Sequence, residues 1–506
     1  MSVLNLDNIA GRIDAAMVYP LAKRTHLQSI GQKNGMDIWL KREDQQDVFS
    51  FKIRGAANRI SKLTDAEKLR GVVCASAGNH AQGVALAASD AQIKSTIFMP
   101  VTTPDIKTEA VTALGGEIRL VGDSYDAAFA AAQEFAAKTG AVFIHAFDDP
   151  DVIAGQGSVA KEILAQIPNP AAIYIGVGGG GLLAGIGAYL RVHSPETKII
   201  AVEPEGAATL KTSLDAGEPT TLNVVDGFAD GVAVKRIGET TYELAGQIAP
   251  QSILVSNDEI CAAVKIIFEK TRTVVEPAGA LALAGLLKDT NTQNGACVAI
   301  VSGANVNFDR IGHMVERAEL GAGQEILFSA TLPEKPGSFL KFCEALGDHA
   351  VSEFNYRYAD QATAHVLVGI KIKTPEQGAQ VMDNIRAAGM EVTDLSHNRL
   401  AKEHLRHMVG GTSSARVREH IYSFEFPERP GALRDFLTGL DGRWNISLFH
   451  YRNHGASSGQ VLCGFQTPEN NTPENNEKEL EASLQSTGFI MHNETNNPAY
   501  QMFLKV

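Results

Sequence analysis

Cysteine is scarce in this chain of 506 residues: the five cysteines lie far apart, and no two of them have C-x-x-C spacing. Neither a zinc site nor a disulfide framework is therefore predicted. Long apolar runs are also missing, so no membrane span is predicted. The N-terminal stretch MSVLNLDNIAGRIDAAMVYPLAKR contains acidic residues and no continuous apolar stretch, unlike a secretory signal or a transit peptide. We expect a cytoplasmic protein that keeps its thiols reduced.

Basic residues are fewer than acidic ones, 45 against 58, and the formal net charge is −13. A nucleic-acid partner needs clustered lysine and arginine to neutralise phosphates, so none is predicted. With 44% hydrophobic and 20% charged residues, the composition is that of a globular protein. Since one domain takes roughly 100 to 200 residues, about three or four domains are expected.

Short apolar runs typical of strands, such as GVVCAS, AVFIHAF, AAIYIGVG and KIIAVE, alternate with alanine-rich helical stretches between residues 71 and 309. This alternation predicts an α/β fold with parallel sheets. Near residue 320 the strand patterns change and contain alternating polar residues, as half-exposed antiparallel strands do. A second region of different architecture is therefore expected to start there.

The second region contains an internal repeat. FSATLPEKPGSFLKF (328–342) matches YSFEFPERPGALRDF (422–436), and further on EFNYRY matches LFHYRN. Two related β-α-β-type modules are therefore predicted, at about 325–396 and 419–490, with a C-terminal extension to residue 506.

A glycine-rich stretch follows one of the predicted strands. Gly176, Gly178 and Gly181 satisfy G-x-G-x-x-G before a predicted helix, and Glu203 ends the next predicted strand. By its letters this is the dinucleotide fingerprint. However, glycines before a helix N-terminus suit any phosphate-bearing cofactor, and a purely structural tight turn is a further alternative. The spacing alone does not choose the cofactor.

Three other stretches carry polar groups that could meet at one site. Lys52 in SFKIRGA would, on its own, be a solvated lysine. In CASAGNHAQG, Ser76 and Asn79 offer donors to a small carboxylate, although both residue types are also common helix caps. Ser302 ends a predicted strand in VSGAN, where active sites of parallel sheets lie. A lysine, a phosphate loop, a carboxylate loop and a strand-end serine are together the parts of a pyridoxal-phosphate site.

The motifs SFKIRGA, SAGNHAQG, GGGGL and SGAN follow one another in this order. Through them the chain resembles the fold-type-II pyridoxal-phosphate enzymes, which are tryptophan synthase β-like. With the repeat behind them, it is similar to the biosynthetic threonine ammonia-lyases, or threonine dehydratases, over nearly its whole length. The resemblance implies an α/β catalytic part of two subdomains at 1–320, the smaller at about 42–140, followed by tandem α+β ACT-like regulatory modules.

The resemblance also implies roles for individual residues. Lys52 carries the Schiff base of pyridoxal 5′-phosphate, Asn79 bonds the phenolic oxygen of the cofactor, and Ser302 meets its ring nitrogen. The phosphate loop consists of Gly178, Gly179, Gly180, Gly181 and Leu182. The loop that binds the substrate carboxylate consists of Ser76, Ala77, Gly78, Asn79 and His80. No metal ligand is assigned.

The implied reaction converts L-threonine to 2-oxobutanoate and ammonia, the first step toward isoleucine, with L-serine as a second substrate. A homotetramer and feedback control by isoleucine, or by valine, are implied as well. Two alternatives stay open. The glycine spacing favours an NAD-dependent oxidoreductase, and the repeat favours a catalytically silent amino-acid sensor.

Two tyrosine–arginine pairs recur at matching positions of the repeat: Tyr356 and Arg357 in EFNYRY, Tyr451 and Arg452 in LFHYRN. Duplication alone would preserve such residues if they served the core or a sheet edge. An arginine beside a tyrosine in both copies is also suited to bind the carboxylate of an amino-acid effector. These four residues are the predicted effector site.

Overall fold

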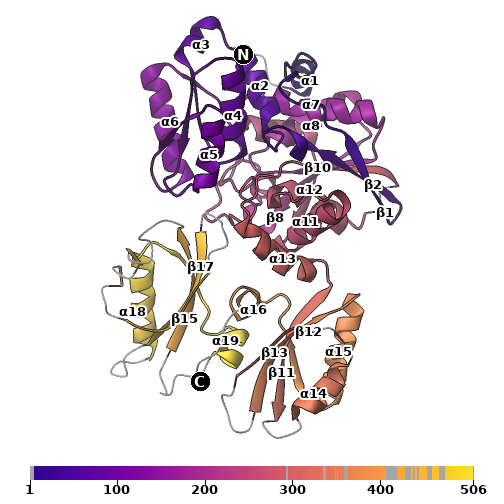
Figure 1. Ribbon diagram of the computed structural model, residues 1–506, viewed down its shortest axis with the longest axis vertical. Coiled ribbons are helices and arrows are strands. Elements are labelled where there is room, and N and C mark those ends of the chain that lie inside the picture. Colours follow the sequence, from indigo (N-terminus) through magenta and orange to yellow (C-terminus); the bar gives the residue numbers. More distant parts are fainter. Residues whose placement is uncertain are drawn as a thin grey trace. The chain divides into compact units, whose positions relative to one another are not determined.

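The computed structural model contains two compact units, Met1–Ala318 and Glu319–Val506, each with its own hydrophobic cores. The described residues are 5–291, 294–333, 338–347, 349, 351–357, 363–405, 419–427, 435–436, 439–440, 444–452, 458–466 and 473–504. The first unit alternates strands and helices, whereas the second has antiparallel sheets with helices (Figure 1).

A six-stranded sheet is the larger of the two sheets in the first unit, with strand order β1-β2-β10-β7-β8-β9. The edge strand β1 pairs antiparallel with β2, and the neighbours from β2 to β9 pair in parallel. The strands are β1 Leu27–Lys33, β2 Met36–Arg42, β7 Ala172–Gly176, β8 Lys198–Pro204, β9 Gln251–Val255 and β10 Gly295–Val301. β7 and β10 are nearly continuous apolar runs, because a parallel sheet is covered on both faces.

Helices cover both faces of this sheet. On one face Ile173 and Ile175 of β7 pack with α1, α7, α8 and α10, and on the other Ala172 and Tyr174 pack with α11, α12 and α13. These helices are α1 Leu6–Asp14, α7 Pro150–Gln166, α8 Gly181–His193, α10 Glu239–Ile248, α11 Asn257–Thr271, α12 Pro277–Lys288 and α13 Asp309–Gly321. Alternate side chains of one strand thus fill two separate cores, as the period of two requires.

A four-stranded parallel sheet with strand order β5-β4-β3-β6 forms the smaller layer of the first unit. Its strands are β3 Val72–Ala75, β4 Ser95–Met99, β5 Glu117–Leu120 and β6 Val142–Phe143. The helices around it are α2 Lys52–Ser61, α3 Asp65–Arg70, α4 Asn79–Asp90, α5 Asp105–Ala113 and α6 Tyr125–Thr139. The short helices η1 Glu43–Gln45, η2 Glu205–Ala207 and α9 Thr209–Ala216 lie in loops. In β4, Ile97 packs with α2 and α4, whereas Phe98 packs with α6.

Two modules of the same topology make up the second unit (Figure 1). Their antiparallel sheets have the orders β12-β13-β11-β14 and β16-β17-β15-β18. The first module contains β11 Glu325–Pro333, α14 Ser338–Leu346, β12 Val351–Arg357, β13 Thr363–Lys371, α15 Pro375–Ala387, β14 Glu391–Asp394 and α16 Arg399–Glu403. The second contains β15 Glu419–Pro427, β16 Asn445–Arg452, β17 Ser458–Gln466, α18 Pro473–Ser486, β18 Ile490–Asn493 and α19 Pro498–Phe503. The sequence repeat is therefore also a repeat of structure.

The last short helix of each module contacts the other module. Arg399 of α16, in the first module, donates to the side-chain oxygen of Gln460 in β17 of the second at 2.9 Å. Met502 of α19, in the second module, has its Sδ 3.1 Å from the hydroxyl of Ser329 in β11 of the first. One apolar cluster, which includes Leu327 and Tyr500, joins the two sheets and helices. The modules thus form one packed unit.

Candidate active site

A pocket in the first unit collects residues that follow strands of both sheets. β7 ends at Gly176, β10 ends just before Ser302, and α4, which follows β3, begins at Asn79. The pocket is lined by every residue predicted to hold the cofactor, namely Lys52, Asn79, Gly178, Gly179, Gly180, Gly181, Leu182 and Ser302. Separate stretches of sequence therefore converge where ligands bind in parallel α/β sheets.

Lys52 is the first residue of α2, and its half-buried side chain lines the pocket. Its Nζ donates to the backbone carbonyl of Ala146 at 2.9 Å, and no carboxylate of the described residues forms an ion pair with it. Burial lowers the pKa of Lys52 to about 8, against the attraction of Glu276. At neutral pH more of this amine is uncharged than in a surface lysine, which suits a nucleophile or a base.

The glycine loop after β7 passes between walls that leave no space for side chains. A Cβ atom at Gly178 would lie 2.7 Å from the backbone of Val232, and one at Gly179 would collide with the ring of Phe147. Gly180 has a φ of 88°, a left-handed conformation that glycine adopts easily. The 13-residue helix α8 starts directly after it, so the first N–H groups of this helix border the pocket. A helix N-terminus beside a loop without side chains suits a phosphate group.

Glu276, which directly precedes α12, lines the pocket but is not among the residues predicted from the sequence. It is 3% exposed, and its Oε1 accepts a hydrogen bond from Asn79 Nδ2 at 2.6 Å. Burial, with the nearby charge of Asp230, raises the pKa of Glu276 to about 8, so its carboxyl is largely protonated at neutral pH. A signal was present, since VVEPAGALALAGLL places one acid in an apolar run.

Ser302 is 7% exposed, and its hydroxyl donates to the carbonyl of Ala278 at 3.2 Å. A hydroxyl can also donate to or accept from a ring nitrogen. The donors and acceptors of the pocket therefore match pyridoxal phosphate group by group: the amine of Lys52 with the aldehyde, the amide of Asn79 with the phenolic oxygen, and the helix N-terminus with the phosphate. The residues present fit this cofactor.

The stretch predicted to bind the substrate carboxylate lies only partly at the pocket. Asn79 alone lines it among the five predicted residues, Ser76, Ala77, Gly78, Asn79 and His80. The hydroxyl of Ser76 accepts from the backbone N–H of Gly78 at 3.2 Å. His80 is buried, with Nε2 2.9 Å from the carbonyl of Ile144. Burial, with the charge of Lys52, lowers the pKa of His80 to about 3, so this histidine is neutral and supports the loop.

Glu203, which a dinucleotide-binding site would place on a ribose, has a structural role. It is fully buried, and its two carboxylate oxygens accept from the backbone N–H groups of Leu210 and Lys211 at 2.7 and 2.9 Å. It caps α9 and does not line the pocket. In the described ranges, no group of three or more His, Cys, Asp or Glu side chains could hold a metal ion. None of the helices in those ranges has the length and apolar character to span a membrane.

The predicted effector residues lie at equivalent places of the two modules. Tyr356 and Arg357 end β12, and Tyr451 and Arg452 end β16, which are corresponding edge strands of the two sheets. Their side chains lie outside the described part of the structure. The geometry of an effector site therefore stays a prediction.

Family models match both units. Residues 19–303 match the model for pyridoxal-phosphate dependent enzymes, and residues 316–405 and 410–504 match the C-terminal regulatory domain of threonine dehydratase. The biosynthetic L-threonine dehydratase of Burkholderia multivorans is 45% identical over 97% of this chain and 98% of its own length.

Two solved structures match a shorter part of the chain. The processed form of threonine deaminase isoform 2 from Solanum lycopersicum has a TM-score of 0.60 and 43% identity, and the match covers 62% of this chain and 93% of that one. Maize serine racemase has a TM-score of 0.58 and 32% identity, with 62% and 96% covered. This chain is thus a pyridoxal-phosphate-dependent enzyme, as its motifs predicted. It belongs to the biosynthetic threonine dehydratase family, whose members are lyases.

Proposed function

We propose that this chain eliminates the β-hydroxyl group of L-threonine to form 2-oxobutanoate and ammonia, on the route to isoleucine, and that it also accepts L-serine. One observation carries the proposal: Lys52 presents an amine without a carboxylate partner beside a glycine loop at a helix N-terminus. One water is lost when the β-hydroxyl leaves with the Cα proton, and one is taken up when the amino group is replaced by oxygen. The reaction therefore needs no oxidant or reductant.

Each cofactor group has a proposed partner in the pocket. Lys52 would hold the cofactor covalently through Nζ, Asn79 would donate to the phenolic oxygen, and the hydroxyl of Ser302 would face the ring nitrogen. The phosphate would be held by the start of α8 and by the loop of Gly178, Gly179, Gly180, Gly181 and Leu182. When bound, the cofactor withdraws electrons from the substrate Cα and makes its proton acidic.

Lys52 is also the proposed base at Cα. An amine with a pKa of about 8 can accept and release a proton near neutral pH, as a general base must. Glu276, whose carboxyl is largely protonated, adds little negative charge to the pocket. Phe147 and Val232 add apolar surface to the lining of the pocket and would help to exclude water from the reacting atoms.

We further propose a division of labour along the chain. Residues 1–320 would be catalytic, with a smaller subdomain at about 42–140, and the modules at 325–396 and 419–490 would bind isoleucine, or valine, through their paired tyrosine and arginine residues. The match to a regulatory domain supports an effector role. A homotetramer in the cytoplasm is proposed as well, and the free cysteines of the described residues, Cys74, Cys261, Cys297 and Cys463, suit a reducing compartment.

The reaction is tested on the full-length holoenzyme. Borohydride should abolish a visible absorption band and leave the cofactor attached to a peptide that contains Lys52, and L-threonine should yield a 2-oxo acid. Lys62→Ala is the matched control. It removes a surface lysine at the end of the same helix and should keep full activity. A bound cofactor with no 2-oxo acid from threonine or serine would favour the sensor instead.

The effector proposal is tested by the isoleucine dose response at sub-saturating threonine. Arg452→Ala should weaken inhibition by about 10-fold, within the usual range of allosteric coupling, and leave the cofactor spectrum unchanged. Arg386→Ala, a surface arginine of α15, is the control. Unchanged inhibition in Arg452→Ala would remove this residue from the effector site.

A further inference from the structure

The loop that follows β10 runs alongside the segment that leads into Lys52. Backbone hydrogen bonds of 3.1 and 2.8 Å and an antiparallel bridge link the two. The pairs are Phe51 with Ser302, Ser50 with Gly303, and Phe49 with Ala304. Lys52 and Ser302, which come from distant parts of the sequence, are thereby held in one register across the pocket.

Asn305 continues this pairing with its side chain. Its Nδ2 donates to the backbone carbonyl of Val48 at 2.8 Å and also to Oδ1 of Asn79. A carbonyl only accepts hydrogen bonds, so the nitrogen of the Asn305 amide must face Val48. Both N–H groups of that amide are then used, and the oxygen of Asn79 is held toward Asn305.

The amide nitrogen of Asn79 consequently points the other way. One N–H donates to Glu276 Oε1 at 2.6 Å. Nothing in the described part of the chain accepts the second N–H, and Asn79 lines the pocket. The two ends of an amide are nearly equal in size, so shape alone does not decide which end faces a ligand. Here the hydrogen bond from Asn305 decides it.

We propose that Asn305 is a positioning residue for the cofactor, because it turns the amide of Asn79 so that a donor meets the phenolic oxygen. This inference rests on the proposed function, in which Asn79 contacts that oxygen. An N–H stabilises the negative charge that the oxygen carries, whereas the reversed amide would place a carbonyl oxygen against it. The amide nitrogen of Asn305 thus donates to both Val48 and Asn79. The backbone carbonyl of Val48 fixes the orientation of Asn305, and Asn305 fixes that of Asn79.

The isosteric change Asn305→Asp tests this role, since it replaces the donor by a second acceptor. Asn79 should then turn over to donate to the new carboxylate, and its own oxygen should face the cofactor. We expect the dissociation constant of pyridoxal phosphate, measured by equilibrium dialysis of the full chain, to rise about 10- to 100-fold. The visible band should move to shorter wavelength, because the phenolic oxygen then keeps its proton more readily.

Asn307→Asp makes the same charge change in the same loop, at a residue that does not line the pocket, and should bind cofactor like the wild type. Asn305→Ala removes the donor without adding charge and should raise the dissociation constant about 10-fold, so it serves if the aspartate variant does not fold. Circular dichroism checks the fold of each variant. Wild-type binding and an unshifted spectrum in folded Asn305→Asp would overturn the proposal.

A double-mutant cycle separates positioning from a direct effect. If Asn305 acts through Asn79, then Asn305→Asp should add nothing to the effect of Asn79→Ala on the dissociation constant. Additive effects would refute the positioning role, and so would an Asn79→Ala protein that binds cofactor normally. The proposed reaction fails by a different result, the absence of 2-oxo acid from wild-type protein with a borohydride-sensitive cofactor band.

Discussion

Two lysines of the first unit have opposite surroundings. Lys41, in β2, has a fully buried side chain whose Nζ donates to a carboxylate oxygen of Glu162 at 2.6 Å and to the carbonyl of Thr25. Lys52 donates to the carbonyl of Ala146 and has no ion-pair partner among the described residues. Burial lowers the pKa of both lysines, but only Lys41 has a carboxylate in contact that holds its proton.

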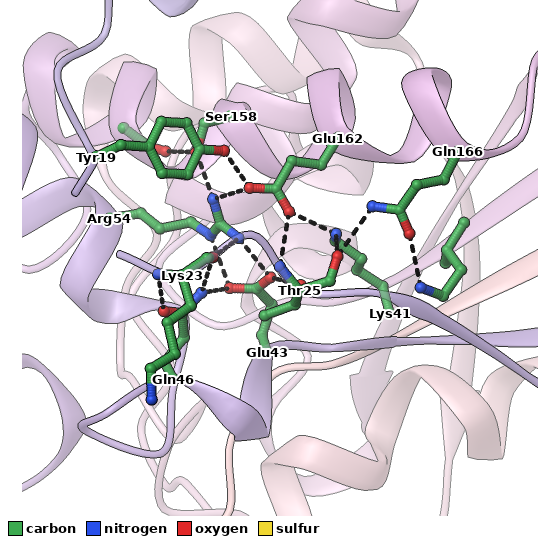
Figure 2. Close-up of polar contacts among 12 residues, drawn as sticks. Tyr19, Lys23, Thr25, Lys41, Glu43, Gln46, Arg54, Ser158, Glu162 and Gln166 are labelled. Carbon is green, nitrogen blue, oxygen red and sulfur yellow. Dashed lines mark hydrogen bonds and ion pairs between the residues drawn. The ribbon is translucent and has the colours of Figure 1, made fainter. Parts of the chain in front are cut away.

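Lys41 belongs to a buried network around Arg54 (Figure 2). The Arg54 guanidinium donates to both oxygens of Glu43 at 2.7 and 2.8 Å and to Glu162 at 2.8 Å. Arg54 and Lys41 thus balance the charges of the two carboxylates. Burial alone would raise the pKa of Glu162, but the adjacent cations hold it below its ordinary value. The network joins β2 and η1 to helices α2 and α7.

The comparison of Lys41 with Lys52 shows how a buried charge that stabilises the fold differs from a buried group suited to catalysis. Paired buried charges stay ionised and connect elements of the fold. Buried ionisable groups without an oppositely charged group in contact shift toward their neutral forms, as Lys52 and Glu276 do, and such groups are suited to proton transfer. Arg54 and Lys52 lie on the same helix, so the paired charges anchor α2 while the proposed reaction would use its first residue.

Removing the pocket amine should have the largest effect. Lys52→Ala should reduce 2-oxo acid formation by about 10⁴-fold or more, because it deletes both the proposed covalent anchor and the proposed base, while the Tm stays near that of the wild type. Lys41→Met should do the reverse, with a lower Tm and nearly normal turnover in the folded enzyme. The checks are a 2-oxo acid assay and thermal unfolding. Normal turnover in Lys52→Ala would break the comparison.

Breaking the charge network should cost stability rather than chemistry. Arg54→Met leaves Glu43 and Glu162 without their shared cation, so we expect a loss of about 3 to 5 kcal/mol in the free energy of unfolding. Arg54→Lys keeps the charge but not the forked geometry of the guanidinium, so its stability should lie between those of the wild type and Arg54→Met. Urea unfolding of the full chain measures the loss. Wild-type stability combined with lost turnover would instead give Arg54 a role in the reaction.

The pH dependence of stability sharpens the comparison at Glu276. The unfolded carboxyl releases its proton near its ordinary pKa of 4.5, whereas the folded one keeps it to about 8. Between these values the folded state binds more protons, so the free energy of unfolding falls as the pH rises, by up to a few kcal/mol.

Glu276→Gln keeps an oxygen that can accept from Asn79 but has no proton to lose, so it should remove this slope. The measurement is the Tm of both proteins at about pH 5 and about pH 8. Equal changes in Tm for the two proteins would show that Glu276 is ionised in the folded state.

The smallest effect is expected at the edge of the network. The hydroxyl of Tyr19 donates to Glu162, and burial, with this hydrogen bond, raises the pKa of Tyr19 to about 12. Tyr19→Phe leaves Glu162 bound to Lys41 and Arg54, so the loss should be about 0.5 to 1.5 kcal/mol with an unchanged pH–rate profile. Urea unfolding provides the check, and a loss as large as that of Arg54→Met would contradict the view that the charges dominate.

Much of the fold could be predicted because strand-forming runs have a local signature. AAIYIGVG and KIIAVE became β7 and β8, and the repeat became two modules of one topology. The predicted strand AVFIHAF is reduced to Val142–Phe143, because the backbone N–H groups of Phe147 and Asp148 donate to His145 Nδ1 and turn the chain. β1, β2, β5 and β9 were not predicted, since polar residues interrupt their apolar pattern.

The candidate site was only partly accessible from the sequence. Motifs predicted Lys52, Asn79 and Ser302, because each stands in a local pattern with recognisable glycines and polar residues. The place of Glu276 in the pocket and the proposed second role of the SGAN motif, through Asn305, depend on contacts between segments that are far apart in the chain. A local sequence pattern cannot predict such contacts.

By itself the sequence determined the alternation of strands and helices, the glycine positions, the repeat and the order of the catalytic motifs, since all of these depend on neighbouring residues. Only the tertiary structure decided which charged side chains are buried away from solvent. The run KRED at 41–44 is of a kind that is ordinarily solvated, yet none of its residues is more than 3% exposed. A charge can be buried when an opposite charge compensates for the lost hydration. Here Arg54 of α2 pairs with Glu43, and Glu162 of α7 pairs with Lys41. The same requirement separates Lys41, which has such a partner, from Lys52, which does not.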